Sequence, residues 1–241
     1  MKRWFESARS RSVQLLQGVA EVPAEFAFNA LDPRLQRQVT TAEQAAAGGR
    51  PEFASDICRR ILVANPGCLH VRRLLRQSRE ARNAGSPPAM MDSVLRTCRS
   101  VLALGFGRLL LSRDPSSATL VAERVIGDRA NAASGHILLA RAAEACGWRD
   151  TAVFAWECAL ACAPRDTRLR LALGKACCAS GRSEQAIQAA EAVLRESPDH
   201  PGAESLLHRA CVAKSLDSAW YAVDEERDDR PYNHPNRKPT V

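Results

Sequence analysis

Apolar residues recur along the chain with helical spacing, in segments of about 12 to 14 residues that glycine and proline separate. No stretch shows the alternation of apolar and polar residues that marks a strand. Aromatic residues make up only 5% of the chain, and its apolar residues are mostly Ala, Leu and Val. A core built from such small side chains requires helices that approach one another closely. The sequence therefore predicts an all-α protein with essentially no strand.

One pattern recurs in the second half of the chain when residues 133–166 are aligned with residues 167–200. The matched pairs, each 34 positions apart, include Leu139 with Leu173, Ala140 with Gly174, Gly147 with Gly181, Asp150 with Glu184, Ala152 with Ala186, and Pro164 with Pro198. The glycines are expected to end the first helix of each hairpin, because the left-handed conformation costs glycine least. The acidic residues open the second helix, and the prolines end it. The same offset extends the register from Arg99 to roughly Asp217.

Small, aromatic and proline positions in this order resemble the tetratricopeptide repeat (TPR), whose unit is 34 residues long. The clearest copy places these residues at the positions of the family motif: Leu139, Ala140, Ala143, Ala152, Trp156, Ala159 and Pro164. The next copy has Leu173, Gly174, Cys177, Ala186, Ala190, Val193 and Pro198. His136 and Arg170 replace the first-helix tryptophan of the family. The resemblance implies an α-solenoid of TPR-like helical hairpins in a superhelix, whose first helices line a concave, peptide-binding side.

A second register lies upstream and is out of phase with the first. The residues Ala42, Ala45, Gly49, Glu52, Ala54, Cys58, Ile61 and Pro66 have the spacing of Ala140, Ala143, Gly147, Asp150, Ala152, Trp156, Ala159 and Pro164. Gly49 and Gly147 are 98 positions apart, which is not a multiple of 34. We therefore expect two arrays rather than one continuous stack.

The positions of proline, glycine and charge divide the chain into five expected segments. These are a basic N-terminal helix and turn (1–34), a TPR-like hairpin plus one further helix (35–82), a linker and lead-in helix (83–98), three TPR-like repeats with a C-terminal capping helix (99–220), and a disordered tail (221–241). Within the second segment, the helix expected at 69–82 carries five arginines around a short apolar face.

Motifs of catalysis are missing from the sequence. It contains no Gly-rich phosphate loop, no H-E-x-x-H, no G-x-S-x-G and no paired C-x2-C. Cys158 and Cys162 stand one helical turn apart, a spacing that suits zinc, but no second tight pair accompanies them. We therefore expect a protein that is not an enzyme, needs no cofactor and holds no metal.

Two features place the protein in the cytoplasm. Nine cysteines, an odd number, occur without a secretory signal sequence, which favours reduced thiols over a disulfide framework. The apolar run from Val101 to Leu111 is far below the roughly 20 residues of a membrane-spanning helix. Three interpretations of the basic N-terminal segment stay open: a helix that contacts an anionic membrane, a transit peptide, and a solvated helix docked on the first hairpin.

Basic residues recur at one position of successive first helices. Arg141, Lys175 and Arg209 are each 34 positions apart, and apolar Ile137 and Leu171 lie one helical turn before the first two. These five residues form the predicted ligand groove, which would bind an acidic peptide. A solvated basic face without a ligand is the other interpretation.

Trp148 follows the glycine that ends a first helix, where the next repeat has Arg182. It is interpreted either as an exposed contact residue or as a side chain packed against the neighbouring turn.

The predicted function is a scaffold or adaptor that binds another protein or a peptide. A net charge of +7 and the arginine-rich helix at 69–82 keep a second function open, an RNA- or ribosome-associated repeat protein. A secretion or assembly chaperone is a third. The sequence determines neither the partner nor the oligomeric state.

Overall fold

The structure is a computed structural model that describes residues 24–83, 90–128 and 132–228. Every regular element in these ranges is a helix, and one isolated parallel bridge joins Phe26 to Cys68. The predicted all-α fold is confirmed. None of the described helices combines the length and the apolar character that a bilayer span requires. The chain divides into two compact units, Met1–Cys162 and Ala163–Val241.

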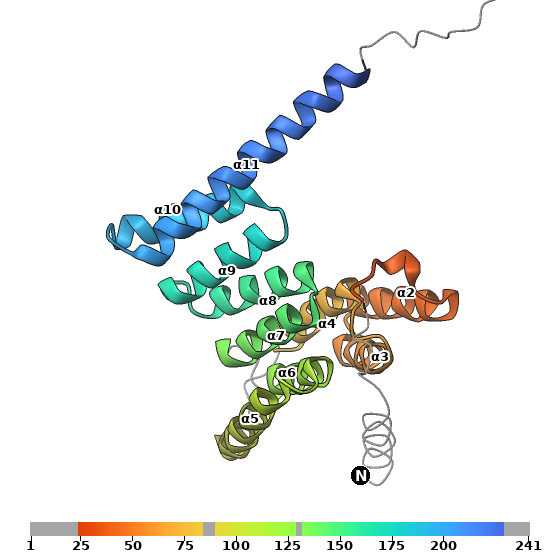
Figure 1. Cartoon of the computed structure of the whole chain (residues 1–241). Helices are drawn as coiled ribbons and strands as arrows, with labels where there is room; N and C mark the ends of the chain where they lie inside the picture. Colours follow the sequence, from red (N-terminus) through yellow and green to blue (C-terminus); the bar gives the residue numbers. More distant parts are fainter. Residues whose placement is uncertain (1–23, 84–89, 129–131, 229–241) are drawn as a thin grey trace, which may run out of the picture. The chain divides into compact units, whose positions relative to one another are not determined.

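The first unit begins with the upstream array. Its elements are the 3-10 turn η1 (Phe28–Ala30) and the helices α2 (Pro33–Ala47), α3 (Pro51–Ala64) and α4 (Leu69–Asn83). Asp32 caps α2 by accepting a hydrogen bond from the amide of Arg34 at 2.7 Å. The predicted Gly49 lies in the turn after α2 with φ 73°, in the left-handed region. The core residues of this array include Val39, Ala42, Ala54, Cys58, Ile61, Leu62, Val71 and Leu75. Figure 1 shows the three helices packed in sequence order.

Four further helices complete the described part of the first unit. They are α5 (Met90–Leu110), α6 (Pro115–Asp128), α7 (Ala133–Cys146) and α8 (Arg149–Cys162), and each packs against the next (Figure 1). Gly147 ends α7 in the left-handed conformation, with φ 76°. Ala140 and Ala152 are buried where α7 and α8 pack together, as their small size predicts. Helix α5 runs without interruption across position 99, where the sequence predicted a change from the lead-in helix to the array.

The second unit contains α9 (Thr167–Ala179), α10 (Ser183–Glu196) and α11 (Pro201–Asp228). Gly181 turns the chain between α9 and α10 with φ 78°. Gly174 permits close packing of the three helices: a Cβ there would lie 2.6 Å from a methyl carbon of Leu206 and 3.0 Å from the Cβ of Ala189. The small residue predicted at this position therefore has a packing role.

The C-terminal boundary differs from the expectation. Helix α11 extends to Asp228, so residues 221–228 of the predicted disordered tail are helical. These residues contain Asp, Glu and Arg but no proline, and the first helix-breaking residue is Pro231. The remaining tail, like most of the predicted N-terminal helix, lies outside the described residues. The other predicted segment boundaries stay predictions.

Candidate functional site

Helix α4 carries two buried arginines that share one carboxylate. Arg72 and Arg79 are 2% and 4% exposed. The Nη1 atoms of Arg72 and Arg79 lie 3.0 and 2.7 Å from the two carboxylate oxygens of Glu123 on α6. Burial by itself raises the pKa of Glu123, but the attraction of Arg79 and Arg72 outweighs it, and the pKa falls below its ordinary value. Two buried positive charges thus face one buried negative charge. We call this cluster of Arg72, Arg79 and Glu123 the arginine joint.

Aromatic rings cover the same face of α4. The guanidinium carbon of Arg72 lies 5.5 Å from the ring centroid of Trp148, and those of Arg73 and Arg76 lie 5.9 and 6.0 Å from the centroid of Phe154 on α8. These are cation–π distances. Four of the five α4 arginines therefore contact α6, the turn before α8, or α8 itself. The arginine-rich helix, which favoured a nucleic-acid partner, uses most of its charge in contacts within the first unit.

Trp148 is buried, with 1% of its surface exposed. The interpretation as an exposed contact residue is wrong; the side chain is packed, as the alternative expected, but against helices rather than a neighbouring turn. Its neighbours in the core are Ala143 and Ala152, and the guanidinium of Arg72 lies over its ring. Comparison with Arg182 in the next repeat could not reveal this, because Arg72 belongs to the out-of-phase array.

A carboxylate from the start of the described chain caps α8. Glu25 accepts hydrogen bonds from the backbone amides of Asp150 at 3.1 Å and Thr151 at 2.7 Å, and also from the Thr151 hydroxyl. The first amides of a helix have no partner within it, and a negative charge there also meets the positive end of the helix dipole. Residues near the N-terminus thereby fix the beginning of α8.

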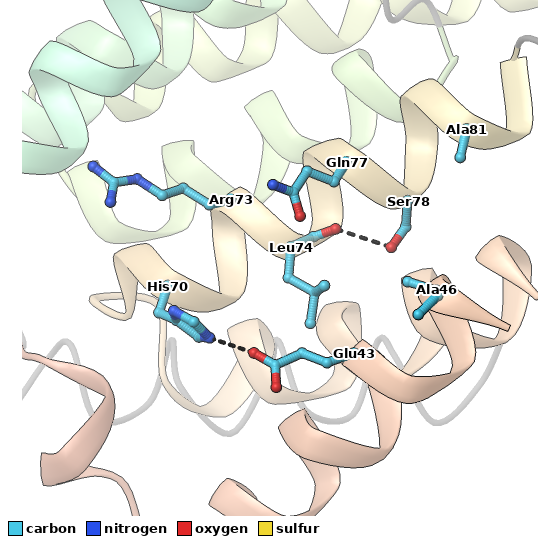
Figure 2. Close-up of a pocket in the computed structure, with 9 residues that line it drawn as sticks. Glu43, Ala46, His70, Arg73, Leu74, Gln77, Ser78 and Ala81 are labelled. Atoms are coloured by element: carbon cyan, nitrogen blue, oxygen red, sulfur yellow. Dashed lines mark hydrogen bonds and ion pairs between the residues drawn. The ribbon is translucent and has the colours of Figure 1, made fainter.

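A groove lies between α2 and α4, the first helices of two successive hairpin positions. It encloses about 500 Å³, and its walls are formed by Glu43, Ala46, Ala47, His70, Arg73, Leu74, Gln77, Ser78 and Ala81. Figure 2 shows Glu43 of α2 and His70 of α4 turned toward each other, with Leu74 beside them. The Nε2 of His70 lies 2.8 Å from a carboxylate oxygen of Glu43. The groove therefore has an apolar floor and polar side chains able to hydrogen-bond a peptide.

The lining of this groove was missed by the sequence prediction, although a signal for it exists. Glu43, Arg73 and Gln77 precede Arg141, Leu171 and Lys175 by 98 positions each, the offset that relates the two registers. Applying that offset to the predicted row would have selected three of the lining residues. His70 has no counterpart in the row and could not have been found in this way.

The predicted groove residues fall into both units. Ile137 is half-buried and Arg141 is exposed on α7 of the first unit. In the second unit, α9 carries the half-buried Leu171 and the exposed Lys175, and α11 carries the exposed Arg209.

Helices α9 and α11 pack against each other, so the structure places Leu171, Lys175 and Arg209 on neighbouring helices. A Cβ added to Gly202 of α11 would lie 3.3 Å from a methyl carbon of Leu171. Within the part of the chain that the structure describes, neither cation takes part in an ion pair or a side-chain hydrogen bond.

All nine cysteines are free thiols, four of them buried. Burial raises the pKa of Cys158 to about 12, against a smaller opposite effect of Arg76, and burial likewise raises the pKa of Cys58 to about 12. Such thiols stay protonated at neutral pH. Among the described residues no group of three or more His, Cys, Asp or Glu side chains has the arrangement of a metal site.

The hairpins α7–α8 and α9–α10 turn at the left-handed glycines Gly147 and Gly181, which stand 34 positions apart, and α2–α3 turns at the left-handed Gly49. The chain therefore folds as a helical-repeat protein whose hairpins resemble the tetratricopeptide repeat.

No model of a known family matches the sequence, and no curated protein matches it. Solved structures to which the chain is similar include three helical-repeat proteins. The match to the MamA protein covers 85% of this chain and 98% of the MamA chain, at 16% sequence identity and a TM-score of 0.43. The match to the TPR2AB domain of yeast Sti1, in complex with pHSP90, covers 73% of this chain and 69% of the Sti1 chain, at 13% sequence identity and a TM-score of 0.45. The match to the thermophilic TPR protein TTC0263 of Thermus thermophilus covers 74% of this chain and 98% of the TTC0263 chain, at 19% sequence identity and a TM-score of 0.35.

Proposed function

We propose that the protein is a non-catalytic scaffold that binds a peptide segment of another protein along its first helices. The observation that carries this proposal is the groove between α2 and α4. Its lining includes the counterparts of three residues in the row that the sequence predicts for the ligand. Stacked helical repeats use such first-helix surfaces to hold extended or helical peptides.

Two exposed cations of the second unit favour an acidic ligand there. Lys175 and Arg209 are exposed on two packed helices, and Leu171 lies one turn from Lys175 as an apolar anchor. Isolated surface ion pairs contribute only about 0 to 1 kcal/mol each, so the cations matter when both act on one ligand beside an apolar contact. Ile137 and Arg141 present the same pair of residue types on α7, and we propose that they contact the partner as well.

The test begins with the partner itself. The full chain, used as bait in its native host, should retain a protein whose binding segment is acidic. The double variant Lys175→Glu and Arg209→Glu should weaken binding of that partner at least tenfold, and Arg141→Glu should weaken it less. The expected melting temperature is nearly unchanged, because the side chains are exposed.

Arg195→Glu is the matched control, since Arg195 is an exposed arginine on α10, a second helix. Reversal of its charge should leave binding intact. Unchanged binding by the folded double variant would refute the role of Lys175 and Arg209. If the double variant and the Arg195→Glu control lost the same binding affinity, the loss would be an effect of net charge and not of a site at Lys175 and Arg209.

A further inference from the structure

A second cavity lies beside the arginine joint and is separate from the first-helix grooves. It encloses about 350 Å³ in the first unit, between residues of α4, α6, α7 and α8. Arg76, Arg79, Glu80, His136 and Ala161 are among the residues that line it. We propose that this cavity binds a small oxyanion of the phosphate type, either free phosphate or a phosphate group on a small molecule.

The charge balance around the cavity favours an anion. Glu123 is the shared partner of Arg72 and Arg79, and Glu80 pairs with Arg76 at 2.6 Å. The Arg76–Glu80 pair is balanced and partly exposed, whereas in the arginine joint two buried guanidinium groups share one carboxylate. A buried charge without full compensation is costly, and a bound anion would remove that cost.

Hydrogen-bonding capacity points the same way. Arg79 is 4% exposed, and its Nη1 and Nη2 atoms donate to the side chain and backbone of Glu123. Its Nε is buried and has no hydrogen-bond partner among the described residues. An unsatisfied buried donor on a cavity-lining side chain suits an oxyanion, because guanidinium groups bind phosphate oxygens through charge-assisted hydrogen bonds.

The size of the cavity is consistent with a ligand larger than water. Small-molecule sites in proteins enclose roughly 300 to 1,000 Å³, and this cavity lies at the lower end of that range. A ligand there would touch α4 of the upstream array together with α7 and α8. It would therefore stabilise the folded first unit in proportion to its occupancy.

The experiment measures binding to the full chain by titration calorimetry and thermal unfolding. The probes are inorganic phosphate and glycerol 3-phosphate, each compared with sodium chloride at equal ionic strength. We expect saturable binding and a rise in melting temperature with at least one of the two phosphates, and none with chloride. The tighter probe identifies the source of the phosphate group. An equal response to chloride would overturn the proposal.

Three variants sharpen the test. Arg76→Gln removes one guanidinium group from the cavity and should weaken binding at least tenfold, since a charge-assisted hydrogen bond is lost. Glu80→Gln removes the competing carboxylate and should tighten binding severalfold. Ala161→Leu narrows the cavity without changing a charge and should weaken binding at least tenfold.

Ala145→Leu is the matched control for Ala161→Leu, because Ala145 is an exposed alanine on α7 away from the cavity lining. It should bind as the unmodified chain does. Unchanged binding by the folded Ala161→Leu variant, or weaker binding by Glu80→Gln, would contradict a site in this cavity.

Discussion

Arg72 on α4 and Arg170 on α9 occupy the same register position in the two arrays, 98 residues apart, yet their surroundings differ. Each donates a hydrogen bond from Nη2 to the carbonyl of the proline six residues earlier, at 2.6 Å to Pro66 and 2.8 Å to Pro164. The side chain of Arg72 is completely buried and paired with Glu123, whereas that of Arg170 is 20% exposed and paired with Glu196.

The comparison separates what the local sequence determines from what tertiary packing determines. The bond to the proline carbonyl depends on residues close in sequence, and both arrays form it. Burial of the charge depends on helices that come from elsewhere in the chain. Only Arg72 is covered, because α6 and the turn at Trp148 pack over it.

The largest expected difference between the two positions comes from removing the carboxylates. Glu123→Ala leaves two buried arginines without their partner and should lower the free energy of unfolding by about 3 to 5 kcal/mol. Glu196→Ala breaks a partly exposed pair and should cost about 0 to 1 kcal/mol. Urea unfolding of both variants measures the two costs. An equal loss of unfolding free energy in the two variants would show that the arginine joint stabilises the protein no more than the partly exposed pair does.

Acid should expose the same difference. The folded pKa of Glu123 is lowered, so its contribution to stability is complete above the unfolded carboxyl pKa of about 4.3. That contribution is lost as the pH falls from there through the lower folded pKa. Glu123→Gln should therefore flatten the decline of stability below about pH 4.3 relative to the unmodified chain. Parallel stability curves for the two proteins would contradict the buried pair.

Replacing the arginines themselves should have a smaller effect. Arg72→Met removes the stacking on Trp148 and leaves the Pro66 carbonyl without its donor, but Glu123 keeps Arg79, so we expect a loss of about 2 kcal/mol. Arg170→Met should cost less than about 1 kcal/mol, because water can replace the donor. Thermal unfolding of each variant checks the ranking, and a larger loss at Arg170 would reverse it.

The smallest of these effects concerns the cap on α8. Glu25→Gln removes the negative charge from the helix N-terminus but keeps an acceptor oxygen, and should lower stability by about 1 kcal/mol. Glu52→Gln is the control, since Glu52 lies in the first turn of α3. Hydrogen exchange should show faster opening of the first turn of α8 in the Glu25 variant alone. Unaltered exchange in the first turn of α8 in this variant would show that Glu25 does not stabilise the start of the helix.

Much of the fold could be predicted from the sequence, because its signals are local. Gly147 and Gly181 were expected at left-handed turns and have φ values of 76° and 78°. A helix was expected at 69–82, and α4 spans Leu69–Asn83.

The arginine joint and the cap on α8 could not be predicted in this way. Arg72 and Glu123 are 51 positions apart, and Glu25 and Thr151 are 126 apart. Patterns of apolar and polar residues assign arginine and glutamate to the surface, so a buried ion pair leaves no trace in them. The groove between α2 and α4 could be predicted in part. Three of its nine lining residues follow from the 98-residue offset, but the others and the depth of the groove depend on packing.

The central claim is that the first helices bind the partner, and hydrogen exchange of the full chain with and without the captured partner tests it most directly. We predict that bound partner slows exchange in the first helices α2, α4, α7, α9 and α11, with little change in the second helices α3 and α10. Protection confined to α3 and α10, with none in the first helices, would contradict the claim.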